Sequence, residues 1–229
     1  DRLAHQPLSF SVSETTEGVH IHIIDAELMG KGEKEKKDLY IEGVQNNGII
    51  NHYEYIINSE GTIEIRHVLK PEGKMPLWFP RIGLTLTVSD ALDQVKWYGR
   101  GPQENYPDRK TGYPMGIYAS TVQAMYEPYL MPQDYGLRTD VRWLQLTTDK
   151  GIGLQFKMNE WFNFNIYPYS TDNLTKAMYT YQLQKQKGMT LNLDYATTGV
   201  GCTARGVFGA YKAMPQEYRR TISIKPMMK

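Results

Sequence analysis

The sequence has few of the residues on which many catalytic and metal sites depend. Cys202 is the single cysteine among 229 residues, so no disulfide can form within the chain. The chain could therefore fold in a reducing or an oxidising compartment. The five histidines end at His67, so the later two thirds of the chain has no imidazole to offer. No apolar run approaches the roughly 20 residues of a membrane span, and no membrane partner is expected.

Several signatures of common enzyme classes are also missing. There is no G-x-S-x-G nucleophile elbow, no P-loop and no G-x-G-x-x-G motif before a helix. Lys and Arg number 26 against 25 Asp and Glu, which gives a net charge of +1. A chain this balanced has no general attraction for nucleic acid. The longest charged run, residues 31–38, mixes both signs and predicts a solvated loop.

Alternation of apolar and polar residues is what the sequence has in abundance. Such alternation puts one row of side chains on a core and the other on solvent or a neighbour. Turn signals separate the segments at residues 17–18, 46–48, 59–61 and 149–151. Many short strands at this spacing predict an all-β, antiparallel sandwich. The alternating segments are residues 8–13, 19–23, 62–68, 82–88, 141–146, 191–194 and 221–224.

Little else interrupts this pattern. A short helix is predicted to begin at residues 170–171, where Ser170 or Thr171 can cap it. Residues 97–136 are rich in Pro, Gly and Tyr and predict a long irregular segment of functional importance. We expect residues 1–229 to form a single domain. The start at Asp1 resembles neither a signal peptide nor an initiator, and predicts a fragment of a larger multidomain enzyme; a mature or engineered start is the alternative.

Candidate chemistry rests on histidines, carboxylates and aromatics. His20 and His22 share a strand face, but a zinc site needs at least three ligands and no cysteine is near, so no metal site is predicted. The acidic residues of the middle third could in principle flank a glycosidic bond, yet spacing alone does not show a catalytic pair. Asp108 beside Arg109 more often forms an ion pair. The crowded tyrosines suit sugar stacking, an interface, or simple filling of the space between sheets. The acidic residues are Glu104, Asp108, Glu127 and Asp134.

Residues 97–109 carry the most specific motif of the chain. They read WYGRGPQENYPDR, which resembles the W-x-G-x-G-P-x-E-x-Y-x-D-R signature in the small-chain domain of family 2 β-galactosidases. Other segments resemble the same family in the same order, so the resemblance covers essentially the whole chain. These segments are residues 80–84 (PRIGL), 126–138 (YEPYLMPQDYGLR), 162–165 (FNFN), 191–194 (LNLD) and 198–201 (TGVG).

The resemblance implies a large antiparallel supersandwich, similar in fold to galactose mutarotases. It implies an accessory C-terminal domain of a β-galactosidase-type glycosidase, with both catalytic glutamates on a TIM-barrel domain of the same polypeptide. The accessory domain would pack against that barrel, help shape the galactoside site and hydrolyse nothing alone. No cofactor is expected in this segment, and Mg or Na ions are expected in the complete enzyme. Homo-oligomerisation and a bacterial cytoplasmic or periplasmic location are left open.

The same resemblance implies that the motif and the closing strand contact carbohydrate. A purely structural role, in which Glu104, Asp108 and Arg109 only tether the loop, is an equal alternative. Well-known members have a sugar-stacking Trp at the position of Thr190, and a G-G-D-x-S-W stretch where this chain has residues 201–206 (GCTARG), so the substrate is left open. The expected carbohydrate-binding residues are Tyr98, Arg100, Glu104, Tyr106, Arg109, Thr190 and Asp194.

Two other functions are compatible with the pattern. A free-standing aldose epimerase would have a similar fold, but such enzymes use histidines with a glutamate as acid and base. Confinement of the histidines to the first 67 residues argues against that function. A self-contained carbohydrate-binding module would show an exposed aromatic platform, and the tyrosine-rich middle third is compatible with one.

Overall fold

The computed structural model describes residues 3–29, 47–201 and 206–228. The charged run at 31–38, Asn46 of one predicted turn, Cys202 and most of the 201–206 stretch lie outside these residues. The chain divides into two compact units. The first runs to Phe79 and takes in Met214–Lys225, and the second is mainly Pro80–Ala213. Nothing in the structure tests the prediction of a single domain.

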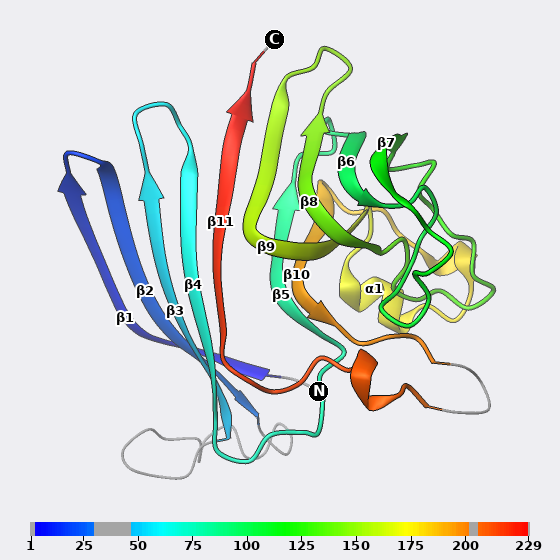
Figure 1. The fold of residues 1–229 in the computed structure, drawn as a ribbon, viewed down its shortest axis with the longest axis horizontal. Coiled ribbons are helices and arrows are strands. Elements are labelled where there is room, and N and C mark those ends of the chain that lie inside the picture. Colours follow the sequence, from blue (N-terminus) through cyan, green and yellow to red (C-terminus); the bar gives the residue numbers. More distant parts are fainter. Residues whose placement is uncertain (1–2, 30–46, 202–205, 229) are drawn as a thin grey trace. The chain divides into compact units, whose positions relative to one another are not determined.

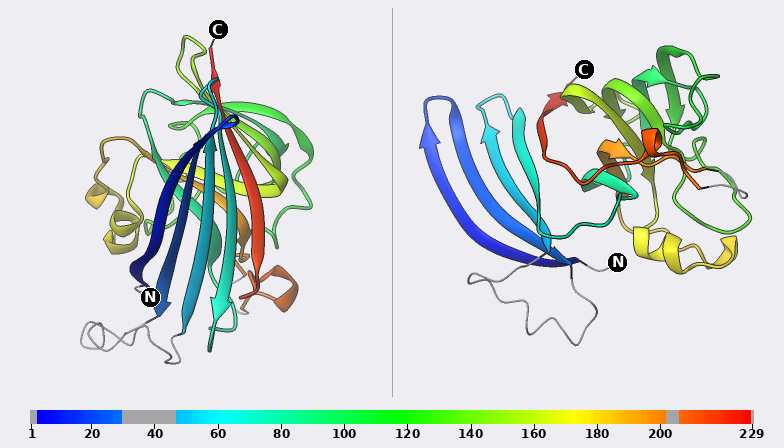
Figure 2. Two further views of the ribbon diagram at one scale, coloured as in Figure 1. Left: turned by 90° about the vertical axis from the view of Figure 1, so that its left-hand side faces the viewer. Right: turned by 60° about the horizontal axis from the view of Figure 1, so that its bottom comes forward.

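The first unit is a five-stranded antiparallel sheet. Its strands lie in the order β1–β2–β3–β4–β11, side by side in Figure 2. Alternation puts one side-chain row of β2, β3, β4 and β11 on a core that includes Ala26, Ile49 and Ile65. In β1 the prediction of a buried row is wrong, because the apolar residues Leu8, Phe10 and Val12 are exposed. The strands are β1 (Leu3–Thr15), β2 (Gly18–Met29), β3 (Gly48–Ile57), β4 (Ile63–Glu72) and β11 (Tyr218–Met227).

The second unit is a path of six antiparallel strands, in the order β7–β6–β8–β9–β10–β5 (Figure 1). Trp97, Leu144 and Phe164 come from three of these strands and are almost completely buried. The strands are β5 (Arg81–Val88), β6 (Gln94–Arg100), β7 (Met115–Thr121), β8 (Arg138–Thr147), β9 (Gly153–Tyr167) and β10 (Met189–Thr197).

Helix is scarce, as predicted. The helix α1 (Thr171–Lys176) begins where the sequence indicates, because the Ser170 side chain accepts a hydrogen bond from the backbone N–H of Asn173. Two single 3₁₀ turns, η1 (Thr180–Gln182) and η2 (Gly209–Tyr211), complete the helical content of the described residues. No helix in this part of the chain is long and apolar enough to cross a membrane.

The all-β antiparallel prediction is confirmed, and each of the seven alternating segments lies in or overlaps an observed strand. The prediction that residues 97–136 are irregular is wrong in part, because the segment holds the end of β6 and all of β7. β7 pairs with β6 on one side and forms an edge of the described sheet. Its half-exposed residues need no strict apolar alternation, so the sequence pattern is weak there.

Candidate functional site

Glu104 is the centre of a first polar cluster, in the loop that follows β6. It is only 6% exposed. Arg109 Nη2 donates to its Oε1 at 2.7 Å, and the backbone N–H of Gly136 donates to its Oε2 at 2.9 Å. The hydroxyls of Tyr106 (3.3 Å) and Tyr129 donate to it as well. A buried carboxylate requires partners of this kind, and here they come from three segments of the chain.

These partners decide the charge of Glu104. Burial raises its pKa, but the hydrogen bonds from Tyr129, Gly136 and Arg109 outweigh burial and hold the pKa below the usual value. Burial and the Glu104 charge together raise the pKa of Tyr106, so its phenol stays a donor. The cluster is therefore a fixed anion surrounded by donors, which suits a structural anchor better than an acid or base that must titrate.

Arg100 tethers the same loop at a second point. Its Nε donates to Asp140 Oδ2 at 2.5 Å, and its Nη1 donates to the carbonyls of Lys110 (3.2 Å) and Tyr113 (2.9 Å). Lys110 Nζ also reaches Asp140 Oδ1 at 2.8 Å. Asp140 has a φ of 56°, a left-handed conformation that aspartate tolerates better than most residues. Arg100, which was expected to contact sugar, thus has its Nε and Nη1 donors engaged within the protein.

Asp108 ties the loop to a distant turn of the same unit. Its carboxylate accepts hydrogen bonds from the backbone N–H groups of Val200 (3.0 Å) and Gly201 (2.7 Å). A Cβ at Gly199 would lie 2.3 Å from Asp108 Cγ, so this approach depends on a glycine. The close approach of Asp108 therefore explains why the first residue of the G-x-G at 199–201 is a glycine.

β10 provides a second polar cluster. Its residues alternate between apolar Leu191 and Leu193 on one face and Thr190, Asn192 and Asp194 on the other. β10 pairs with β5 and β9 along its two edges, and the side chains on both of its faces are buried. A buried polar face of this kind must be satisfied by hydrogen bonds.

Arg81, at the start of β5, satisfies much of that face. Its Nη2 donates to Asp194 Oδ2 at 2.8 Å, and its Nη1 donates to Asp134 Oδ1 at 3.3 Å. Asn192 Nδ2 donates to Asn165 Oδ1 at 2.8 Å, directly across the β9–β10 pairing. Complete burial raises the pKa of Asp194 to about 6, with Arg81 opposing the rise. Burial alone would lower the pKa of Arg81, but Asp194 and Asp134 raise it above its ordinary value.

Residues 134–136 join the two clusters. Asp134 accepts from Arg81 and, at 2.9 Å, from Asn165 Nδ2, while the N–H of Gly136 donates to Glu104. Gly136 has a φ of 75°, which only glycine adopts readily. Each cluster has one partly exposed residue. Arg109 (47% side-chain exposure) offers a hydrogen-bond donor from the first cluster, and Asp134 (43%) offers an acceptor from the second.

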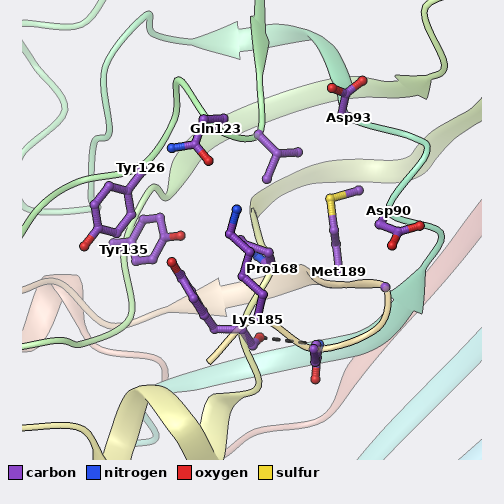
Figure 3. A pocket seen from close by; sticks show the side chains of 12 residues that line it. Asp90, Asp93, Gln123, Tyr126, Tyr135, Pro168, Lys185 and Met189 are labelled. Carbon is purple, nitrogen blue, oxygen red and sulfur yellow. Dashed lines mark hydrogen bonds between the residues drawn. The ribbon is translucent and has the colours of Figure 1, made fainter. Parts of the chain in front are cut away.

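Thr190 is buried and cannot take over the stacking role of a Trp. Its hydroxyl donates to the Tyr169 carbonyl at 2.7 Å and accepts from Gln186 Nε2 at 2.8 Å. Gln186 also lines a pocket of about 330 Å³ in the second unit (Figure 3). The hydroxyl of Tyr135, another lining residue, is buried and has no hydrogen-bond partner among the described residues. The pocket is also lined by Asp90, Asp93, Gln123, Tyr126, Lys185 and Met189.

Tyr98 belongs to a separate aromatic surface. It is half-exposed on β6 and packs beside Trp143 on β8, with ring centroids 6.5 Å apart. The Arg142 guanidinium lies 5.9 Å from the Tyr98 ring and 3.5 Å from the exposed ring of Trp161. This surface offers aromatic faces, but one of them is already covered by a cation.

The structure therefore brings together some of the predicted residues. Glu104, Tyr106 and Arg109 form one cluster, whereas Asp194 belongs to the second and Tyr98 to the aromatic surface. The sequence did not single out several partners that hold these residues. Part of the signal was present in residues 80–84 and 126–138, which resemble family segments. The missed partners are Arg81, Tyr129, Gly136 and Asn165.

The carboxylates of these clusters do not fit a Mg²⁺ or Na⁺ site. Such cations prefer several free oxygen ligands. Here Glu104 is paired with Arg109, Asp194 with Arg81, and Asp140 with Arg100. These carboxylates are therefore assigned no role in binding either ion.

Comparison with known proteins gives one coherent result at the level of sequence. The family described as "Beta galactosidase small chain" matches residues 9–224. The β-galactosidase of Priestia megaterium is 38% identical over 147 residues, which are 64% of this chain and 14% of that protein. The β-galactosidase of Vibrio cholerae is 39% identical over 122 residues, 53% of this chain and 11% of that protein. The chain thus spans only a small part of the length of the relatives it matches.

Among solved structures, an aldose epimerase homologue from C. elegans is similar with a TM-score of 0.46 and 12% sequence identity. The alignment covers 96% of this chain and 69% of that one.

Proposed function

Because the chain belongs to the β-galactosidase small-chain family, we propose that it is an accessory domain of a β-galactosidase-type glycosidase. Its role is to form one wall of a galactoside site, while the nucleophile and the acid/base carboxylate lie on a TIM-barrel domain of the same polypeptide. A retaining mechanism places those two carboxylates roughly 5–5.5 Å apart on either side of the glycosidic bond. Any Mg²⁺ or Na⁺ that serves that reaction is assigned to the rest of the polypeptide.

One observation supports this role above the others. The motif loop, residues 101–114 between β6 and β7, is held by Glu104, Arg100 and Asp108 through contacts with other segments of the chain, yet it leaves the Arg109 side chain 47% exposed. A rigid loop that presents such a donor can orient sugar hydroxyls at little entropic cost, and the partly exposed Asp134 of the segment that joins the two clusters offers an acceptor. The same residues contain no unengaged pair of carboxylates, which suits positioning rather than hydrolysis.

In this account each cluster has its own task. Glu104 holds the loop in place, Arg109 and Asp134 contact the sugar, and the buried face of β10 keeps Arg81 and Asp134 in register. The family suggests a β-galactoside or a close relative as the substrate. Buried Thr190 offers no stacking surface to that sugar, so the choice among such substrates is left open. Misplacement of a positioning group by about 1 Å can cost on the order of a hundredfold in rate.

The test uses the complete β-galactosidase that contains this chain, assayed with a chromogenic β-galactoside. Arg109→Ala removes an exposed donor, and we expect kcat/KM to fall at least about tenfold, as a lost charged hydrogen bond predicts. Glu104→Gln loosens the loop, and we expect a loss of similar size. Arg219→Ala, on the exposed face of β11, is the matched control and should leave kcat/KM unchanged.

The proposal fails if Arg109→Ala has the kcat/KM of the unmodified enzyme while remaining folded by circular dichroism. Arg109→Lys keeps a positive charge beside Glu104 but removes the guanidinium, so it keeps the test decisive even if the other two variants do not fold.

A further inference from the structure

One face of the first unit carries a cross-strand row of polar residues. His22 on β2 lies directly opposite Glu54 on β3, and Glu54 lies opposite Arg66 on β4. His20 is two residues before His22, so its side chain projects from the same face of β2. The register of three strands therefore places two imidazoles and one carboxylate together.

The distances are short enough for one ion to be shared. His20 Nδ1 lies 3.4 Å from Glu54 Oε1, and His22 Nε2 lies 4.0 Å from the same oxygen. One ligand atom from each of the three residues lies within 4.8 Å of the other two. Zinc bonds to nitrogen and oxygen are about 2.0–2.2 Å long. The three ligand atoms must therefore move closer to one another, by distances from a fraction of an ångström up to about 1.5 Å, which side-chain rotation can provide.

The orientation of Glu54 favours a ligand on one oxygen. Arg66 Nη1 donates to Glu54 Oε2 at 3.0 Å, which leaves Oε1 turned toward the histidines. An outer partner that holds a ligating carboxylate in this way is typical of metal sites. The Arg66 charge also repels a cation, so the affinity is lower than it would be without Arg66.

His20 provides a second, independent indication. Its side chain is only 13% exposed, and its Nε2 is buried without a hydrogen-bond partner among the described residues. A carboxylate oxygen of Glu17 lies 4.0 Å from that nitrogen, just beyond hydrogen-bonding distance. A metal ion on Nδ1 would fix the proton on Nε2 and draw Glu17 in as an outer partner, as ligating histidines usually require.

We propose that His20, His22 and Glu54 bind one Zn²⁺ ion, with its fourth position open to water or to an external ligand. Two imidazoles and a carboxylate are a ligand set that zinc accepts, and His22 (51% exposed) leaves the ion accessible. The sequence alone predicted no metal because the third ligand was missing. Glu54 is 32 residues from His22 and is brought in only by strand pairing. The site does not depend on the proposed carbohydrate role, since all of its residues belong to the first unit.

The test is a titration of the 229-residue chain with Zn²⁺ alone, by isothermal calorimetry in metal-free, non-chelating buffer. We expect saturable binding of one Zn²⁺ per chain. His22→Ala and Glu54→Gln should each weaken binding at least about tenfold, the lower limit seen when even an outer partner of a metal is lost. His52→Ala, on the same sheet but outside the cluster, is the matched control and should bind like the unmodified chain.

Nuclear magnetic resonance supplies a readout that does not depend on variants. Zn²⁺ should shift or broaden the imidazole signals of His20 and His22 and spare that of His67. The proposal is overturned if no stoichiometric binding occurs, or if binding survives His22→Ala and is lost in His5→Ala.

Discussion

Two buried carboxylates of this chain have opposite pKa shifts, for reasons visible only in their partners. Glu104 receives hydrogen bonds from Arg109, Gly136 and two tyrosines, and its pKa is lowered. Asp194 is completely buried on β10 beside a second carboxylate, Asp134, and its pKa rises to about 6 although Arg81 pairs with it. Glu104 is therefore a permanent anchor, whereas the charge of Asp194 depends on Arg81.

His67 gives the clearest pH prediction at the scale of one residue. It is buried, donates through Nε2 to Asn51 Oδ1 at 3.1 Å, and stacks on Tyr53. Burial lowers its pKa to about 4, against 6.5 for the exposed imidazole. The unfolded chain therefore binds this proton more readily, and stability is lost as the pH falls from about 6.5 to about 4. The loss is on the order of 3 kcal/mol.

Urea unfolding of the chain at several pH values measures this effect. His67→Gln keeps a donor for Asn51 but cannot titrate, so we expect the variant to lose about 3 kcal/mol less than the unmodified chain over that range. His22→Gln, which replaces an exposed imidazole, should keep the full pH dependence. Equal slopes for His67→Gln and the unmodified chain would show that His67 is not held neutral by burial.

At the scale of elements, the proposed role requires that contacts with other segments of the chain hold the motif loop in place. Asp108 is the contact that makes this testable, because it accepts from the backbone N–H groups of Val200 and Gly201. Asp108→Ala should speed hydrogen exchange at these two amides at least about tenfold, since a hydrogen bond to a charged group contributes about 1.5–3 kcal/mol. Asp149→Ala, in an exposed turn, is the control.

A change confined to the mutated loop, with Val200 and Gly201 exchanging at their original rates, would contradict this tether. A global increase in exchange would instead show that Asp108 supports the whole unit. Mass spectrometry at peptide resolution separates the two outcomes.

Elements with strict alternation were predictable from the sequence, and others were not. β2, β4, β5 and β10 are marked by it, and Ser170 correctly marks the start of α1. β9 was not among the predicted alternating segments, although apolar residues recur at alternate positions from Leu154 to Ile166. Glu160 and Trp161 interrupt that alternation, and the pairing of β9 with β8 shifts register at two points.

The contacts of the candidate site could be predicted only where the two partners are close in sequence. Even there, the sequence favoured an ion pair between Asp108 and its neighbour Arg109, but Arg109 pairs with Glu104, five residues away. The Arg81–Asp194 pair spans 113 residues, and it exists only because β5 lies beside β10. The position of Glu54 beside His20 and His22 likewise follows from strand register. Residue types indicate which groups need partners, but topology decides which partners they receive.

At the scale of the molecule, the chain belongs to a family whose curated relatives are far longer. It spans 14% of the Priestia protein and 11% of the Vibrio protein. The buried carboxylates of its second unit are committed to arginines, backbone amides and tyrosines. These facts support a division of labour in which this chain positions the sugar and another part of the polypeptide hydrolyses it.

The most direct test compares hydrolysis of a chromogenic β-galactoside by the 229-residue chain with hydrolysis by the longer polypeptide that the proposed function requires. The account predicts turnover by the complete protein and none above background by the chain alone. Turnover by the chain alone that disappears in Glu104→Gln would contradict the account, because it would make this carboxylate catalytic instead of an anchor.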